Sequence, residues 1–141
     1  ATINFYGLEN IYFVDLPGYG YAKVAKSEKE RWAELIEGYL ASDRDIRLVF
    51  MLVDSRHAPT KDDIHMINYL IDQEMPFVLV LTKVDKLKKT EREKRMEAFK
   101  HEIPYFDEMH SIPFSSQTYE GVEDLRSIIE EIADDNDVSD E

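Results

Sequence analysis

Phe77-Val78-Leu79-Val80-Leu81-Thr82-Lys83-Val84-Asp85 joins an apolar run of strand length to a cluster that holds a lysine and a carboxylate. Two other runs end in the same way: 11–14 leads into Asp15-Leu16-Pro17-Gly18, and 110–114 leads into Ser115-Ser116. Ligands of a mainly parallel α/β sheet sit just beyond the carboxyl ends of its strands. We therefore expect the three clusters to converge on one crevice.

The remaining chain predicts an α/β protein. Two short strand-like runs, 3–6 and 11–15, flank a turn-rich segment and predict a hairpin. After it, periodic segments at 27–40, 60–71, 90–102 and 121–133 predict helices, with capping boxes at 27–30 and 90–93. They alternate with strands predicted at 48–53, expected to be buried on both faces, 77–81 and 110–114. This order implies crossover connections and a three-layer, mainly parallel sheet.

Composition limits the classes of protein. The chain has 141 residues, 43% hydrophobic and 33% charged, which suits one folded domain, expected over 1–133. Residues 134–141 hold five acids and no base, so we expect a disordered tail. No apolar run reaches the ~18 residues of a membrane span, and the start does not resemble a signal peptide. The absence of cysteine fits the cytosol, and the net charge of −13 argues against general DNA or RNA affinity, although a local basic patch remains possible.

The cluster Thr82-Lys83-Val84-Asp85 suits recognition of guanine. A carboxylate can accept two hydrogen bonds from guanine, from N1–H and from the 2-amino group, and adenine offers no such pair of donors. The alkyl stem of Lys83 can lie along the face of the ring. The alternative is a solvated basic loop, because seven bases fall between Lys83 and Arg95; an RNA-contacting patch there is a further alternative.

The other two clusters suit the phosphates and the base. Asp15 would reach a magnesium ion through water, and the N–H of Gly18 would meet the terminal phosphate. The pair Ser115-Ser116 would supply backbone N–H groups to the guanine O6. For each of these clusters taken alone, an ordinary turn is the favoured interpretation. For His57, structural hydrogen bonding is favoured over general-base chemistry, and the four histidines show no zinc-ligand spacing.

Several motifs together resemble the EngB (YihA/YsxC) GTPases of the TrmE-Era-EngA-EngB-Septin-like group. Asp15 to Val24 is similar to their switch II segment, and Asp54-Ser55-Arg56-His57-Ala58-Pro59 to their Asp-x-Arg-His-x-Pro motif. The base-recognition motif matches at 82–85, with the family's threonine where most GTPases have asparagine. Phe114-Ser115-Ser116 resembles the last guanine-contact motif, and Asn4-Phe5-Tyr6 the strand after switch I.

The resemblance implies a P-loop GTPase fold of the Ras-like type, Mg²⁺ as the companion of GTP, and a cytoplasmic protein. It implies association with the large ribosomal subunit, both rRNA and ribosomal proteins, and a role in cell division and septation. Tyr19 stands where Ras-like proteins carry a catalytic glutamine, so slow intrinsic hydrolysis is expected. Gly18 to Lys26, with Tyr19, Gly20, Tyr21 and Lys23, is the expected switch loop.

One departure from the family concerns the phosphate loop. The chain contains no Gly-x-x-x-x-Gly-Lys-Ser/Thr, so we expect a C-terminal portion of a G domain that lacks the first strand and helix. Two alternatives compete with the GTPase switch. The first is a non-enzymatic interaction module on the same scaffold. The second is a receiver-like phosphoacceptor domain, which leaves Pro17-Gly18 and Asp85 unexplained and has no acidic pair at a preceding strand end.

Overall fold

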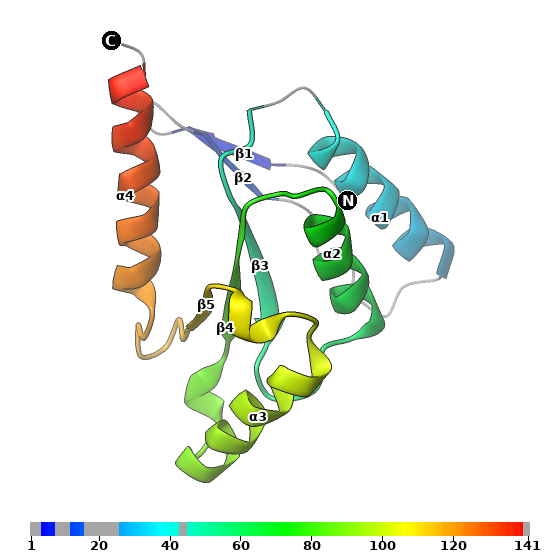
Figure 1. Ribbon diagram of the computed structural model, residues 1–141, viewed down its shortest axis with the longest axis vertical. Coiled ribbons are helices and arrows are strands. Elements are labelled where there is room, and N and C mark those ends of the chain that lie inside the picture. Colours follow the sequence, from blue (N-terminus) through cyan, green and yellow to red (C-terminus); the bar gives the residue numbers. More distant parts are fainter. Residues whose placement is uncertain (1–3, 8–11, 16–25, 43–44, 140–141) are drawn as a thin grey trace. The chain divides into compact units, whose positions relative to one another are not determined.

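The structure, a computed structural model, describes residues 4–7, 12–15, 26–42 and 45–139. In the described residues, an initial pair of strands is followed by four helices that alternate with three further strands (Figure 1). Their bounds are β1 Asn4–Gly7, β2 Tyr12–Asp15, α1 Lys26–Leu40, β3 Val49–Asp54, α2 Lys61–Asp72, β4 Phe77–Thr82, α3 Lys89–Glu102, β5 Ser111–Pro113 and α4 Val122–Ser139. Two short 3₁₀ turns, η1 Val84–Lys86 and η2 Phe106–Glu108, follow β4 and α3.

The chain divides into two compact units, residues 1–46 with 129–141 and residues 47–128. In the first unit, β1 and β2 pair antiparallel, with Phe5 opposite Val14, and form a two-stranded sheet. This pairing confirms the predicted hairpin. In α1, Ile36 and Leu40 are buried, as the apolar periodicity predicts, whereas Leu35 is exposed.

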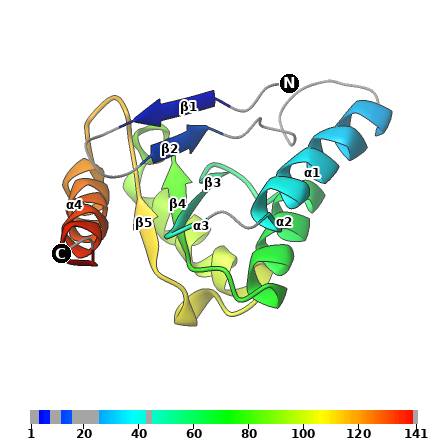
Figure 2. The same ribbon diagram turned by 90° about the horizontal axis from the view of Figure 1, so that it is seen from above.

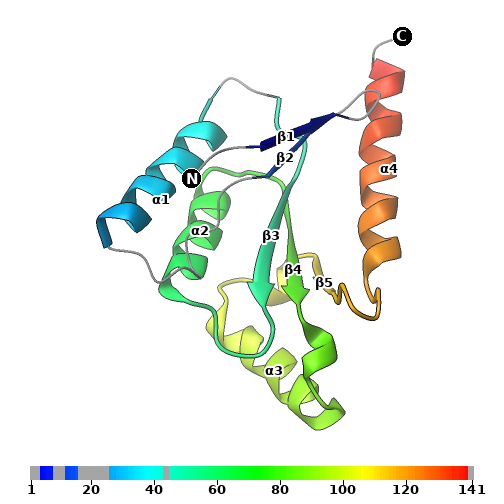
Figure 3. The ribbon, with the colours of Figure 1, turned by 180° about the vertical axis from the view of Figure 1, so that it is seen from behind.

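The second unit is built on a parallel sheet in the order β3-β4-β5 (Figure 3). Val53 pairs with Leu81, and Val80 pairs with Ile112, so the three strands run in the same direction and end at the same edge. Parallel neighbours need crossover connections, which α2 and α3 provide. The predicted parallel α/β arrangement is therefore confirmed.

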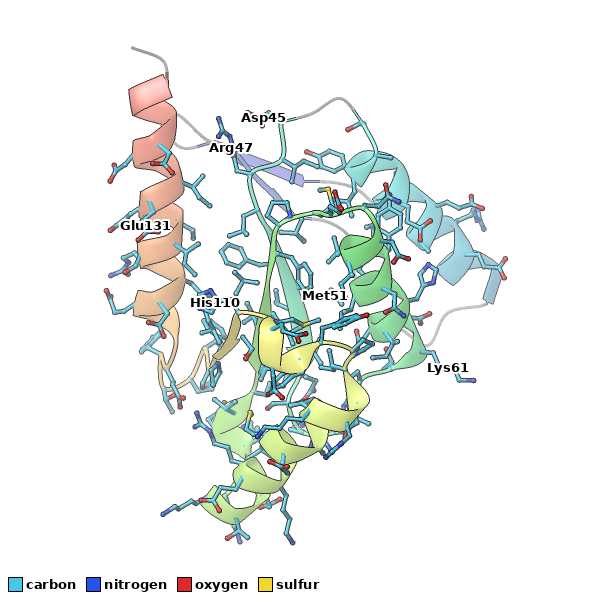
Figure 4. The ribbon with its side chains drawn as sticks, in the orientation of Figure 1. Asp45, Arg47, Met51, Lys61, His110 and Glu131 are labelled. Carbon is cyan, nitrogen blue, oxygen red and sulfur yellow. The ribbon has the colours of Figure 1, made fainter. Side chains whose placement is uncertain are left out.

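Helices cover both faces of this sheet (Figure 2). On one face, Ile67 of α2 and Phe99 of α3 pack against Leu79 and Leu81, with Met51 at the margin of this cluster (Figure 4). On the other face, Leu125 and Ile128 of α4 pack against a cluster of Val78, Val80 and Ile112. The apolar character of β4 follows from this arrangement, because its side chains are covered on both sides.

Burial of β3 differs from the expectation. Val53 is buried, but Leu52 is 54% exposed, so the prediction of a strand covered on both faces is wrong at this residue. Among the described strands, β3 pairs with β4 alone. An apolar run predicts a strand, but it does not distinguish a central strand from one with an open edge.

Two helix starts and one helix end also differ from the bounds predicted from the sequence. The first helix begins at Lys26 rather than after Ser27, and α3 begins at Lys89, where Glu91 accepts from the Lys88 N–H at 3.4 Å. Thr90 is therefore not the capping residue. At the other end of the chain, α4 runs to Ser139 rather than ending near residue 133 as expected. The reason is that 122–139 contains no Gly or Pro, and extending a formed helix adds one hydrogen bond per residue.

Candidate functional site

The carboxyl ends of β3, β4 and β5 meet at one edge of the sheet. The Ser55 N–H donates to the Thr82 carbonyl at 3.0 Å, and the Phe114 N–H donates to the Leu81 carbonyl at 2.8 Å. Beyond the strands, the Val84 N–H donates to the Phe114 carbonyl at 3.2 Å. Two of the three predicted clusters, 82–85 and 114–116, are thereby brought together by backbone hydrogen bonds.

A hydrogen bond between side chains joins these two clusters. The Ser115 hydroxyl donates to Asp85 Oδ1 at 2.8 Å. The same oxygen of Ser115 accepts from the N–H groups of Gln117 and Thr118, both at 3.1 Å, so its proton is committed to the carboxylate. Ser115 is fully buried and the Asp85 side chain is 13% exposed. The carboxylate is thus held in one orientation by a group that is itself fixed.

The loop after β5 is closed on itself and anchored to α3. The Ser115 N–H donates to the Glu120 carbonyl at 3.0 Å, so this N–H is engaged within the loop and Ser116 becomes the candidate donor to a ligand. Arg92 Nη1 donates to Glu120 Oε1 at 2.9 Å. This contact raises the pKa of Arg92 and lowers the pKa of Glu120, because the hydrogen-bonded ion pair favours both charged forms.

Lys83 adopts a backbone conformation that is uncommon for a residue with a side chain. Its φ is 62°, in the left-handed region, directly after β4. Its ammonium lies 3.6 Å from Asp54 Oδ2, and its side chain is 55% exposed. The preceding Thr82 donates its hydroxyl to the Val53 carbonyl at 3.3 Å, which ties the end of β4 to β3.

Asp54, the last residue of β3, is the centre of a charged cluster. Its side chain is 5% exposed, and Arg56 donates Nη2 to Oδ2 at 2.8 Å and Nε to Oδ1 at 3.0 Å. Burial alone would raise the pKa of this carboxyl, but the hydrogen bonds and charge of Arg56 outweigh it and lower the pKa to about 2. Asp54 is therefore charged at neutral pH.

Asp54 opens the Asp-x-Arg-His-x-Pro motif, but the motif alone indicates no role for its carboxylate. A usable signal was present, because Asp54 is a carboxylate at the end of a strand, as Asp15 is. His57 takes part in hydrogen bonding as expected, with Nδ1 3.1 Å from the Ala58 carbonyl oxygen, whereas Nε2 lies 3.8 Å from Asp54 Oδ2, beyond hydrogen-bond distance.

Most of the residues that are expected to contact the phosphates lie outside the part of the chain that the structure describes. Asp15 closes β2, and Leu16, Pro17, Gly18 and the switch residues Tyr19, Gly20, Tyr21 and Lys23 lie outside the described residues. Convergence of this cluster with the other two therefore stays a prediction. Within the described ranges, no three His, Cys, Asp or Glu residues are grouped to hold a metal ion. In the same part of the chain, every helix is too short or too polar to cross a membrane.

Comparisons with known proteins agree on one family. The model of the family described as 50S ribosome-binding GTPases matches residues 1–83. The probable GTP-binding protein EngB of Exiguobacterium sp. is 46% identical over 121 residues, which cover 85% of this chain and 61% of that protein. That of Thermotoga petrophila is 43% identical over 136 residues, covering 96% and 70% respectively. The chain therefore spans about 61% of the length of the Exiguobacterium relative.

Solved structures agree on the fold. The crystal structure of a probable GTP-binding protein EngB superposes with a TM-score of 0.77 at 20% identity, covering 95% of this chain and 84% of that one. The elongation factor SelB of Methanococcus maripaludis, in complex with a GTP analogue, superposes with a TM-score of 0.61 at 25% identity, over 91% of this chain and 26% of SelB.

Proposed function

The chain belongs to the EngB family of GTP-binding proteins, and we propose that it selects guanine nucleotides at the edge where β4 and β5 end. The observation that carries this proposal is the pairing of Asp85 with the buried Ser115 hydroxyl. A carboxylate that is fixed in this way offers acceptors in a defined direction. It therefore matches the adjacent N1–H and 2-amino donors of guanine without reorganising when the base arrives.

Selection against adenine follows from desolvation. Adenine presents no pair of donors to Asp85, so its binding would leave a largely covered carboxylate without hydrogen bonds. Such an unpaired group costs about 1–3 kcal/mol, and more when it is charged. The Ser116 N–H would add a contact to the guanine O6, since the Ser115 N–H is engaged by Glu120.

Replacing Asp85 with asparagine tests the assignment. In a chain extended at its amino end to the length of the curated relatives, Asp85→Asn should weaken GDP binding by about 10- to 100-fold and improve binding of xanthosine diphosphate. The introduced amide can accept from xanthine N1–H and donate to its 2-carbonyl. Competition titration with a fluorescent nucleotide measures both affinities.

Lys86→Gln is the matched control. Lys86 lies 3.8 Å from Asp85 Oδ2 but is exposed, so its loss should change the two affinities together and leave their ratio unaltered. An Asp85→Asn variant with the parental ratio of GDP to xanthosine diphosphate affinity would remove the base-recognition assignment.

The phosphate end of the nucleotide is assigned to the segment after β2. We propose that the Asp15 carboxylate, a ligand type that Mg²⁺ prefers, reaches the ion through water and that the Gly18 N–H contacts the terminal phosphate. Mg²⁺ would supply charge neutralisation there. Residues 18–26 would order with the triphosphate and relax with the diphosphate. Amide hydrogen exchange should then be slower in 18–26 with a GTP analogue than with GDP, and equal exchange would exclude this segment as the sensor.

GTP hydrolysis is proposed to be slow in the absence of a partner. Tyr19 occupies the position where a glutamine would orient the attacking water. The tyrosine side chain offers only one phenolic hydroxyl in place of the carbonyl and NH2 groups of the glutamine amide. An intrinsic turnover as fast as that of a GTPase stimulated by its activating protein would contradict this proposal.

The proposed partner is the large ribosomal subunit, in the cytoplasm, with assembly of the subunit as the process and a further role in cell division and septation. Support comes from the family and from the basic cluster at 83–95, seven bases in a chain of net charge −13. Arg92 and Arg95 are paired with Glu120 and Glu102, which leaves the exposed lysines 88, 89 and 94 as the candidate phosphate contacts. Replacing these lysines by glutamate should abolish co-sedimentation with the subunit, and unchanged co-sedimentation would relocate the contact.

An interaction module that does not bind nucleotide is the second candidate. It predicts ribosome binding that is indifferent to GTP, GDP or an empty site.

A further inference from the structure

The charged cluster around Asp54 is not among the residues proposed to contact the base. Asp54 lies at the end of β3, whereas the residues assigned to guanine lie after β4 and β5. A carboxylate with a 5% exposed side chain is costly to bury unless its charge is compensated. Among the described residues, the side chains of Arg56, His57 and Lys83 approach its carboxylate, and Lys83 belongs to the proposed guanine site.

Arg56 fixes the plane of the Asp54 carboxylate. Its side chain donates to both oxygens, with Nε at 3.0 Å from Oδ1 and Nη2 at 2.8 Å from Oδ2, and its backbone N–H donates to Oδ1 at 3.0 Å. This two-point geometry is specific to a guanidinium. As a result, Oδ2 is held 3.6 Å from the Lys83 ammonium.

The Lys83 side chain must be ordered if its alkyl stem is to lie along a base. The side chain is 55% exposed, and a lysine free in solvent has about 2 kcal/mol of rotamer entropy to lose on being ordered. The left-handed backbone conformation of Lys83 sets the direction of its Cα–Cβ bond, and the ion pair with Asp54 holds its ammonium. With both ends fixed, the apolar stem between them is restricted before a ligand binds.

The cluster also lies within electrostatic reach of the guanine-recognising carboxylate. The pKa of Arg56 is raised, first by its hydrogen bonds with Asp54 and also by the charge of Asp85. The three residues that end β3 and follow β4, Asp54, Lys83 and Asp85, are therefore parts of one charged arrangement.

We propose that Asp54 is a positioning residue for the guanine site, which holds the Lys83 ammonium through a carboxylate oriented by Arg56 so that the lysine stem is pre-arranged to stack on the base. The inference rests on the proposed function, because it requires a base at Asp85. It assigns a role in nucleotide affinity to the first and third residues of the segment Asp54-Ser55-Arg56, and this role requires no contact of either residue with the nucleotide.

A double-mutant cycle between Asp54 and Lys83 tests this role. The variants are Asp54→Asn, Lys83→Met and the pair, in the chain extended to the length of its curated relatives, with GDP affinity as the measurement. Lys83→Met keeps an apolar stem of similar length but has no ammonium to anchor. Asp54→Asn should weaken GDP binding by about three- to tenfold in the parent and have no further effect in the Lys83→Met background.

Asp63→Asn provides the matched control. Asp63 is also a buried aspartate in the second unit, but it caps α2 through Thr60, which donates its N–H to Asp63 Oδ2 at 3.0 Å. Any loss of affinity that Asp63→Asn causes through stability should be equal in the Lys83 and Lys83→Met backgrounds. The same equality for Asp54→Asn would show a purely structural role and overturn the proposal.

The experiment distinguishes failure of the positioning role from failure of the proposed function. If Asp54→Asn does not fold, Arg56→Lys takes its place, because it keeps the charge at residue 56 but loses the two-point contact with Asp54. The proposal then predicts that Arg56→Lys weakens GDP binding in the parent but not in the Lys83→Met background. A loss of GDP affinity that persists in the Lys83→Met background overturns the proposal. A parent protein that shows no preference for GDP over ADP refutes the proposed function itself. A parent that prefers GDP but gives an additive cycle refutes only the positioning role of Asp54.

Discussion

At the scale of single residues, Ser115 shows how a small side chain can define a site. Its hydroxyl donates to Asp85 and accepts from two backbone N–H groups, and all three contacts are made in a fully buried position. Ser116 follows it in the sequence and is exposed. The two serines therefore have different roles, one through its side chain and the other through its backbone.

Alanine replacements distinguish the two serines. Ser115→Ala should lower the free energy of unfolding by about 1–2 kcal/mol and weaken GDP binding, because Asp85 loses the donor that orients it. Ser116→Ala should leave both quantities unchanged, since it retains its N–H. Urea unfolding and GDP titration of the two variants provide the comparison, and equal effects at both positions would contradict the assignment.

The sequence could predict which residues gather at the site but not how they are used. The carboxylate of Asp85 and the pair Ser115-Ser116 were identified from their places at strand ends, and the structure brings them together. The predicted use of the Ser115 N–H was not recovered, because that group pairs with Glu120, five residues later, through a loop closure that no local pattern reveals. The contact of Asp54 with Lys83 joins two strands and likewise has no signal in either segment alone.

At the scale of elements, the loop between β5 and α4 depends on a glycine. Gly121 has φ +84°, and a Cβ built at this residue would lie 2.3 Å from the Pro113 carbonyl oxygen. The same loop carries Ser115, Ser116 and Glu120. Its conformation, and hence the placement of the proposed guanine contacts, therefore requires a residue without a side chain at 121.

Substitution of two glycines tests this requirement. Gly121→Ala should lower the free energy of unfolding by about 2 kcal/mol or more, because both the left-handed φ and the close carbonyl oppose a Cβ. Gly38→Ala is the control: nothing lies within 4 Å of a Cβ at that helical position, so a gain of about 0.5 kcal/mol is expected. A tolerated Gly121→Ala would show that the loop can adopt another conformation.

Secondary structure was predictable where apolar runs were strong, whereas the capping boxes expected at 27–30 and 90–93 did not mark the starts of α1 and α3. The hairpin, the three parallel strands and the Thr60–Asp63 start of α2 were all recovered from sequence. The end of α4 and the exposure of Leu52 were not. An acidic segment without Gly or Pro can continue a helix, and the exposure of a strand residue depends on which neighbours the strand has.

At the scale of the whole molecule, the described strands form two sheets, a hairpin that ends at Asp15 and a parallel sheet that ends at the guanine-side residues. The second sheet carries the residues that are proposed to contact the base. The phosphate contacts would require Asp15, Gly18 and a phosphate loop, for which these 141 residues contain no motif. We therefore expect base selectivity and overall affinity to be separable.

The most direct test of guanine recognition is isothermal calorimetry with GDP and with ADP on the chain extended to the length of its curated relatives. GDP should bind more tightly than ADP by at least about a thousandfold, because a site built to hydrogen-bond one base leaves buried groups unpaired with another. The 141-residue chain, measured in parallel, should bind GDP more weakly for want of phosphate contacts. Equal affinity of the extended chain for GDP and ADP would contradict the assignment of Asp85, Ser115 and Ser116 as a guanine site.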